Sequence, residues 1–195
     1  MQDGKNIDAD YVVSGVGIFN TYQQLIPESL GAKYKFKSKL QKIQPSVGHS
    51  CLYIGLKGSP ESLNFPKNNL WIYPKGIDHD QAVKDYLKDQ EKPFPVVYFF
   101  FPAAKDPSWS ERYPNHSTID IITILPYETF SQWEGSQWMH RGAEYEALKE
   151  QIAQRLLAHL FEQLPLLKGQ IDHYELSTPL TTKNFVNYQK GELYG

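Results

Sequence analysis

The segment from Glu144 to Leu164 constrains the fold of this chain more than any other, because its apolar residues recur at helical spacing. They fall in two adjoining rows: Leu148, Ile152, Leu156, Leu160 and Ala153, Leu157, Phe161, Leu164. Residues four apart lie on one face of a helix, so two adjoining rows make a wide apolar stripe. A stripe of that width is typical of a helix that packs against a sheet.

Several shorter segments supply the strands that such a sheet needs. The strands we expect are Ala9–Ser14, Ser50–Leu56, Leu70–Tyr73, Pro95–Phe101, Ser117–Leu125 and Gln170–Leu176. Short helices are expected at Gly17–Ile26, from Asp78 or Asp80 to Leu87, and as a helix or turn after Thr178-Pro179, whereas Lys33–Ile43 fits either a strand or a helix. Strands and helices do not alternate strictly. The pattern predicts an α+β fold: a mixed, largely antiparallel sheet of about five or six strands, packed against the long amphipathic helix and shorter helices.

The run from Pro95 to Phe101 is continuously apolar and bounded by proline. Such a run is typical of a central strand that is buried on both faces. We expect one face of this strand on the Glu144–Leu164 helix and the other face toward a ligand.

Composition narrows the class of protein. The chain has 195 residues, 41% of them apolar, which indicates one globular domain, or a domain with an appendage. A net charge of −2 gives no field that would hold nucleic acid or an anionic bilayer. The aromatic share of 14% fits a β-rich core, and it also fits a cleft for a large apolar or conjugated ligand.

Targeting and metal signals are absent from the pattern. No stretch approaches the roughly 20 apolar residues of a membrane span, and no apolar segment typical of a secretory signal follows the N-terminus. The location, in the cytoplasm or at a membrane surface, stays undetermined. Cys51 is the only cysteine and the six histidines show no zinc-type pair spacing, so no disulfide and no metal site is expected.

Two constellations could carry chemistry. Gly15-Val16-Gly17 follows an expected strand and opens a helix, as a dinucleotide-binding turn does, but Asn20 stands where the third glycine belongs. Trp133, Trp138, His140 and Arg141 cluster between helices, which we interpret as an aromatic plug of a loop. Taken alone, these residues indicate a globular domain without a complete active site.

The N-terminus suggests a chain cut from a longer protein. Asp3-Gly4 is a hairpin turn signal, yet only Met1 and Gln2 precede it, so the preceding strand is missing. We therefore expect the start of this chain to lie inside a hairpin.

Several segments resemble one family, the phytoene desaturase-like FAD-dependent oxidoreductases, and within it the retinoid-reducing branch. They are Asp3-Gly4-Lys5 with Ile7, Ala9-Asp10 and Tyr11–Ser14; Gly17–Tyr22 with Leu25–Pro27; Phe101–Trp109; Arg112–Pro114 with Ser117-Thr118; Ser177–Thr181; and Gly191–Gly195. The resemblance runs along the whole chain. The stretch Phe-Pro-Ala-Ala-Lys-Asp-Pro-Ser-Trp at 101–109 is its most specific part.

The resemblance implies a division of the chain and a cofactor. Residues 1–16 would be an edge piece of an FAD-binding domain, 17–188 a substrate-binding domain, and 189–195 a return segment toward the FAD-binding domain. The rest of that domain would be a missing partner. FAD in the intact protein would lie near Ser14, Gly15, Gly191, Tyr194 and Gly195, and Tyr98 and Phe100 would contact the substrate. No catalytic residue is assigned, because in this family the flavin performs the redox step.

The implied activity belongs to the intact protein. It would act on a C=C bond of an apolar polyene, a retinoid or carotenoid, by reduction, desaturation or isomerisation, and it could touch a membrane peripherally. This chain alone is expected to hold no flavin and to be inactive. The alternatives are a carotenoid isomerase or desaturase of the same family and a stand-alone module that binds apolar ligands without enzyme activity.

Overall fold

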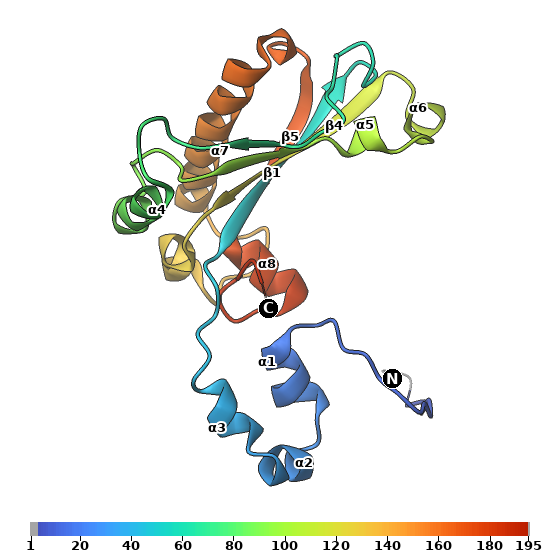
Figure 1. The fold of residues 1–195 in the computed structure, drawn as a ribbon, viewed down its shortest axis with the longest axis vertical. Coiled ribbons are helices and arrows are strands. Elements are labelled where there is room, and N and C mark those ends of the chain that lie inside the picture. The colour runs from blue at the N-terminus through green and yellow to red at the C-terminus, as the bar shows by residue number, and fades with distance from the viewer. Residues whose placement is uncertain (1–3, 195) are drawn as a thin grey trace.

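The computed structural model describes residues 4–194, and their centre is one five-stranded sheet (Figure 1). The strands are β1 (His49–Lys57), β2 (Leu70–Ile72), β3 (Val97–Phe100), β4 (His116–Ile124) and β5 (Ile171–Ser177). Their order is β2-β3-β4-β1-β5, and every pairing between them is antiparallel. The α+β fold expected from the sequence is confirmed.

The described residues also form helices. They are α1 (Ile18–Asn20), α2 (Glu28–Lys33), α3 (Phe36–Leu40), α4 (His79–Lys88), α5 (Pro102–Lys105), α6 (Trp109–Arg112), α7 (Ala143–Gln163) and α8 (Pro179–Val186), with a π-helical turn at Thr21–Leu25 and 3₁₀ helices at Tyr127–Trp133 and Pro165–Leu167. Asp78 caps α4 by accepting a hydrogen bond from the amide of Gln81, and Thr178 and Thr181 form a capping box at the start of α8.

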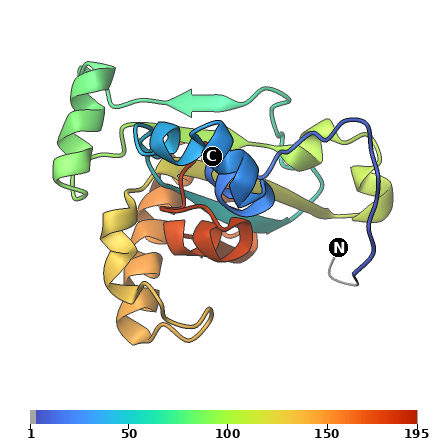
Figure 2. The same ribbon diagram turned by 90° about the horizontal axis from the view of Figure 1, so that it is seen from below.

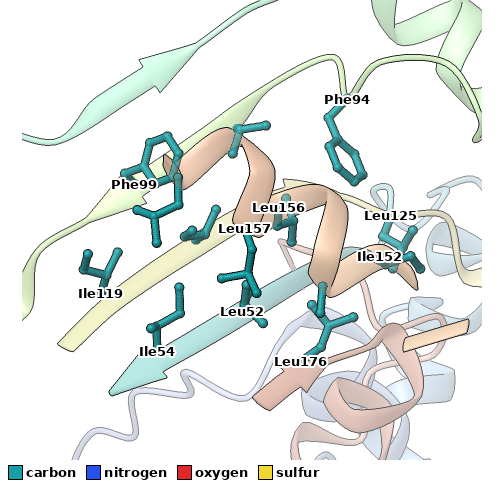
Figure 3. Packing of buried hydrophobic residues seen from close by; sticks show 14 of the residues in the cluster. Leu52, Ile54, Phe94, Phe99, Ile119, Leu125, Ile152, Leu156, Leu157 and Leu176 are labelled. Atoms are coloured by element: carbon teal, nitrogen blue, oxygen red, sulfur yellow. The ribbon is translucent and has the colours of Figure 1, made fainter. Parts of the chain in front are cut away.

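The long helix α7 covers one face of the sheet, as its apolar stripe predicts (Figure 3). Alternate residues of the strands point toward it, because successive side chains of a strand lie on opposite faces. The core they form includes Leu52, Ile54, Phe99, Ile119, Ile121, Ile152, Leu156 and Leu157, all of them buried. Because α7 packs on one face of the sheet only, the opposite face is not covered by it.

The N-terminal helices stand apart from the sheet and touch α8. Asn20 is buried between them: its Nδ2 donates to the carbonyl of Val186 at 3.2 Å, and its Oδ1 accepts from Nδ2 of Asn187 at 3.1 Å. In both Figure 1 and Figure 2, α1 lies beside α8. Hydrogen bonds of Asn20 and Asn187 thus join α1 to the end of α8.

The C-terminal segment pairs with the residues that lead into β1. The amide of Leu193 donates to the carbonyl of Val47 at 3.0 Å, and Gly48 forms a β-bridge with Glu192. Glu192 is buried, and its carboxylate accepts hydrogen bonds from the amides of Gln189 and Lys190 at 3.2 and 2.7 Å. The bonds to Val47 and Gly48 hold this C-terminal segment against the residues that lead into β1.

Three expectations need correction. Ala9–Ser14 forms no strand but runs exposed, because none of the described residues offers it a ladder partner. β3 is second from one edge rather than central; β4 takes the middle position, and Tyr98 and Phe100 of β3 are only half buried. The pairings are all antiparallel rather than mixed.

Two further points concern the ends and the basic segment. Lys33–Ile43, for which the sequence left strand and helix open, contributes to α2 and forms α3. The expected hairpin turn at Asp3-Gly4 falls partly outside the described residues, and Gly195 lies outside them.

Candidate functional site

The face of the sheet opposite α7 carries a surface that we call the open face. It consists of Trp71 on β2, Tyr98 and Phe100 on β3, Asp120 and Ile122 on β4, Cys51 and Tyr53 on β1, and Glu175 and Ser177 on β5. Figure 1 shows α7 along the other side of the sheet, while α8 and the α5–α6 pair lie toward the ends of the strands.

The register of the strands aligns these side chains in two rows across the sheet. In one row Trp71 lies opposite Tyr98, which pairs with Ile122, then Cys51, then Ser177. In the other row Phe100 pairs with Asp120, then Tyr53, then Glu175. Neighbouring strands are ~4.8 Å apart, so five strands make a row about 19 Å long. The first row is apolar over most of its length, as a wall for an extended apolar ligand should be.

Aromatic rings dominate the β2–β3 end of the open face. The ring centroids of Trp71 and Tyr98 are 4.4 Å apart, and Trp71 is 59% exposed. Because large aromatic side chains seldom stay this exposed without a partner, this end of the sheet is a candidate contact surface.

Polar side chains contact the aromatic rings of β3 at this end of the open face. Nδ2 of Asn69 donates to the phenol oxygen of Tyr98 at 2.5 Å, and the ammonium of Lys105 donates to Oδ1 of Asn69. The same ammonium lies 4.4 Å from the centroid of the Phe100 ring. These contacts fix Tyr98 and Phe100, the two aromatic side chains of β3 that lie on the open face.

One carboxyl group interrupts the open face at its centre. Asp120 lies between Phe100 and Tyr53 across the strands, and no ion pair to it occurs within residues 4–194. Burial raises the pKa of Asp120 above its ordinary value, since water solvates the carboxylate poorly there. Its strand, β4, is the middle strand of the sheet, so Asp120 lies near the centre of the open face.

Cys51 and Tyr53 are held in their neutral forms. Burial, with the charge of Asp120 as the second cause, raises the pKa of the Cys51 thiol to about 12. Burial likewise raises the pKa of Tyr53 to about 12. Neither group is an available nucleophile near neutral pH, so the open face offers shape and apolar contact rather than covalent chemistry.

The predicted site residues fall in two separate places. Tyr98 and Phe100, the predicted substrate contacts, both lie on the open face. The described residues predicted to lie near FAD lie outside the sheet: the hydroxyls of Ser14 and Thr21 share a hydrogen bond of 2.6 Å, Gly15 is exposed, and Tyr194 is joined to Ser46.

Gly191 has a local structural reason to be glycine. Its φ is +58°, and a Cβ there would stand 2.1 Å from the carbonyl oxygen of Pro179. The described residues near Gly191 thus pack on each other and do not form a cradle for a flavin by themselves.

The residues of the open face that the sequence reasoning missed are Trp71, Asp120 and Tyr53. The alternation of Ser117–Leu125 places Asp120 on the face opposite Ile119 and Ile121, which was the available signal. Which strands stand beside each other could not be read from alternation.

The predicted aromatic plug divides into two parts. Trp133 packs against Tyr145, with ring centroids 5.4 Å apart, whereas Trp138 lies against the exposed Phe185 at 5.1 Å. Only the first part is a plug of the core.

No helix among residues 4–194 is both long and apolar enough to cross a bilayer. No group of three or more His, Cys, Asp or Glu side chains in the same range is placed to hold a metal ion.

Comparison with known proteins gives a consistent result. No protein-family model matches the chain. It is 31% identical over 194 residues to an all-trans-retinol 13,14-reductase of Homo sapiens. The matched region covers 97% of this chain and 32% of that protein. It is 30% identical over 198 residues to the protein of the same name in Danio rerio, covering 100% of this chain and 32% of that protein.

A more distant relative is named for a different activity. The chloroplastic prolycopene isomerase of Arabidopsis thaliana is 25% identical over 194 residues, covering 98% of this chain and 29% of that protein. The chain thus spans about a third of the length of the curated relatives it matches. It is homologous over its full length to part of the all-trans-retinol 13,14-reductases, and it is related to prolycopene isomerase and phytoene desaturase.

Proposed function

We propose that this chain is the substrate-binding part of an FAD-dependent oxidoreductase that reduces a C=C bond of an apolar polyene, as the names of the all-trans-retinol 13,14-reductases it matches indicate. The observation that carries the proposal is the open face: one side of the sheet is sealed by α7, and the other presents rows of aromatic and aliphatic side chains. A polyene is long, flat and apolar, which matches a flat row about 19 Å long.

The division of the chain follows from this role. Residues 1–16 are an edge piece of the flavin domain, 17–188 form the substrate domain, and 189–195 return toward the flavin domain. The contact between Asn20 and Asn187 supports this division, because an inserted domain leaves and re-enters its host at neighbouring points. Ser14, Gly15, Gly191, Tyr194 and Gly195 are the residues we propose to lie nearest the FAD.

This chain's own residues would bind and orient the substrate. Tyr98, Phe100 and Ile122 would lie along the polyene and exclude water from it, because burying apolar surface is favourable on both sides. The flavin, held by the rest of the protein, would supply the redox chemistry. The half-buried Asp120 would be the polar group nearest the middle of the bound chain.

A second candidate rests on the more distant relatives. Prolycopene isomerase and phytoene desaturase act on carotenoids by name, and the open face would suit a carotenoid for the same physical reasons. The mass of the product separates the three reactions: reduction adds two hydrogens, desaturation removes two, and isomerisation leaves the mass unchanged.

The experiment is to read the gene around this coding sequence and to assay its whole product. The proposal expects a flavin absorption band in the purified protein and a gain of two hydrogens in all-trans-retinol under reducing conditions. Tyr98→Ala and Phe100→Ala should raise KM in that protein. A product without flavin that still binds retinoids would support the stand-alone binding module instead.

A further inference from the structure

We infer that the chain holds a second binding site, for a long-chain carboxylic acid, in a groove between α8 and the loop that precedes α7. The groove has a volume of about 650 Å³, within the range of small-molecule sites. Its walls include Tyr53, Trp138, Met139, Arg141, Tyr145 and Phe185. We call it the Arg141 groove.

The apolar wall of the groove is unusually exposed. Phe185 is 63% exposed and Met139 is 70% exposed, and Trp138 lies edge-on to Phe185 with ring centroids 5.1 Å apart. Three large apolar side chains that are exposed side by side form a patch, and such a patch indicates a contact surface, whereas single exposed apolar residues do not. An aliphatic chain is the ligand part that would cover them.

Arg141 gives the groove one polar end. Its Nη1 donates to the phenol oxygen of Tyr145 at 3.2 Å, and the guanidinium lies 5.1 Å from the Tyr145 ring centroid. Tyr145 is in turn fixed from below, because its hydroxyl shares a hydrogen bond of 2.8 Å with Thr178. The guanidinium is therefore held in one orientation by a buried partner.

The other edge of the guanidinium lacks a partner. Nε of Arg141 is buried without a hydrogen bond, and within residues 4–194 neither Nη2 nor the charge as a whole meets a carboxylate. Because Nε is screened from solvent, a carboxylate in the groove would meet the guanidinium through its terminal nitrogens. A charged hydrogen bond of this kind is stronger than a neutral one.

The second cation of the groove is already neutralised. The ammonium of Lys149 lies 2.5 Å from Oε1 of Glu175 and 3.4 Å from Oε2 of Glu146. A carboxylate entering the groove would be repelled at that end and attracted at Arg141. The charges thus orient the ligand, with its acid group at Arg141 and its chain along Trp138, Met139 and Phe185.

The test uses the purified chain and the fluorescence of cis-parinaric acid, a conjugated fatty acid that becomes bright when it leaves water. The acid should bind saturably, and its methyl ester should bind at least about tenfold more weakly, since the charged hydrogen bonds are lost. Arg141→Gln should weaken the acid by a similar factor and leave the ester unchanged. Phe185→Ala should weaken both ligands.

A matched control shows whether the effect belongs to this arginine. Arg112→Gln removes an arginine that pairs with Asp106 on the loop around α6, at the other end of the strands, and should change neither affinity. Equal affinity of the unaltered chain for acid and ester would overturn the proposal, and this comparison needs no variant. So would an Arg141→Gln chain that unfolds at the native temperature and still prefers the acid.

The Arg141 groove shares Tyr53, Glu175 and Ser177 with the open face, but the two proposals can fail separately. Binding of the acid by this chain can fail while the whole protein reduces retinol, and the reverse result would remove the proposed enzyme and keep the groove.

Discussion

Phe99 and Phe100 are neighbours on β3, yet their rings lie on opposite sides of the sheet. Phe99 is fully buried in the layer under α7, whereas Phe100 is half buried on the open face, with the Lys105 ammonium 4.4 Å from its ring centroid. The same type of residue therefore has a core role at one position and a surface role at the next.

This contrast predicts unequal costs of truncation. Phe99→Ala should lower the free energy of unfolding by about 3–5 kcal/mol, because it leaves a cavity in a packed core. Phe100→Ala should cost about 1 kcal/mol, since its ring is partly in water already. Urea unfolding of both variants measures the difference, and equal, small losses at both positions would contradict the assignment of the two faces.

The bond between Asn20 and Asn187 should hold the N-terminal helices against α8. Asn20→Ala removes a buried group with partners in α8 and in the residues just before its own helix, so it should cost about 1–3 kcal/mol and speed tryptic cleavage after Lys42. Gln24→Ala is the control, because Gln24 only donates to Asn20 from its own segment. Identical cleavage rates in all three chains would show that this contact does not hold the helices.

Cys51 should resist thiol reagents while the chain is folded. It is 4% exposed, and burial raises its pKa to about 12, so at pH 8 the reactive thiolate is scarce. Modification by a chromogenic disulfide reagent should proceed only as fast as the chain opens and should become rapid in urea. Rapid modification without denaturant would place Cys51 outside the sheet.

Two histidines should make the fold sensitive to acid. Burial lowers the pKa of His49 and His159, and Nδ1 of each is buried without a hydrogen-bond partner within residues 4–194. Their pKa in the unfolded chain is the ordinary 6.5, so below that pH the unfolded chain binds protons that the folded chain excludes. Their contribution to stability is complete above pH 6.5 and is lost as pH falls through the lowered values.

Urea midpoints at pH 7.5 and 5 measure this loss. His159→Gln should reduce the difference between the two midpoints, while the same change at the exposed His173 should leave it unaltered. A difference that stays the same in His159→Gln would assign the acid sensitivity to other groups.

The sequence predicted the helices and strands better than it predicted which strands lie side by side in the sheet. Two apolar rows placed α7, and alternation placed β4. Thr178 marked the start of α8, and the start of α4 was narrowed to Asp78 or Asp80, of which Asp78 is the cap, since each of these signals is local. The position of β3 was wrong, because a run of apolar residues reports burial and not the order of strands. The same run predicted burial on both faces. Tyr98 and Phe100 are only half buried, because the described residues place no helix over that face.

The candidate site was predictable only in part. Tyr98 and Phe100 came from the apolar run, but the rows that join them to Trp71, Asp120 and Tyr53 depend on a register that the sequence does not carry. The Arg141 groove joins a loop, a sheet edge and α8, which are brought together only by the folded chain. Sequence reasoning could name Trp138 and Arg141 but interpreted them as a plug.

The proposal that the open face binds a polyene is tested most directly by titrating the chain with all-trans-retinol and following tryptophan emission. Subtracting the signal of Trp71→Phe isolates Trp71, which stands at the end of the apolar row. Binding on the open face should quench Trp71 saturably, Tyr98→Ala and Phe100→Ala should weaken that binding, and Phe185→Ala in the Arg141 groove should not. Retinol that leaves Trp71 unquenched, or that binds equally well after Tyr98→Ala and Phe100→Ala, would contradict the assignment of the open face.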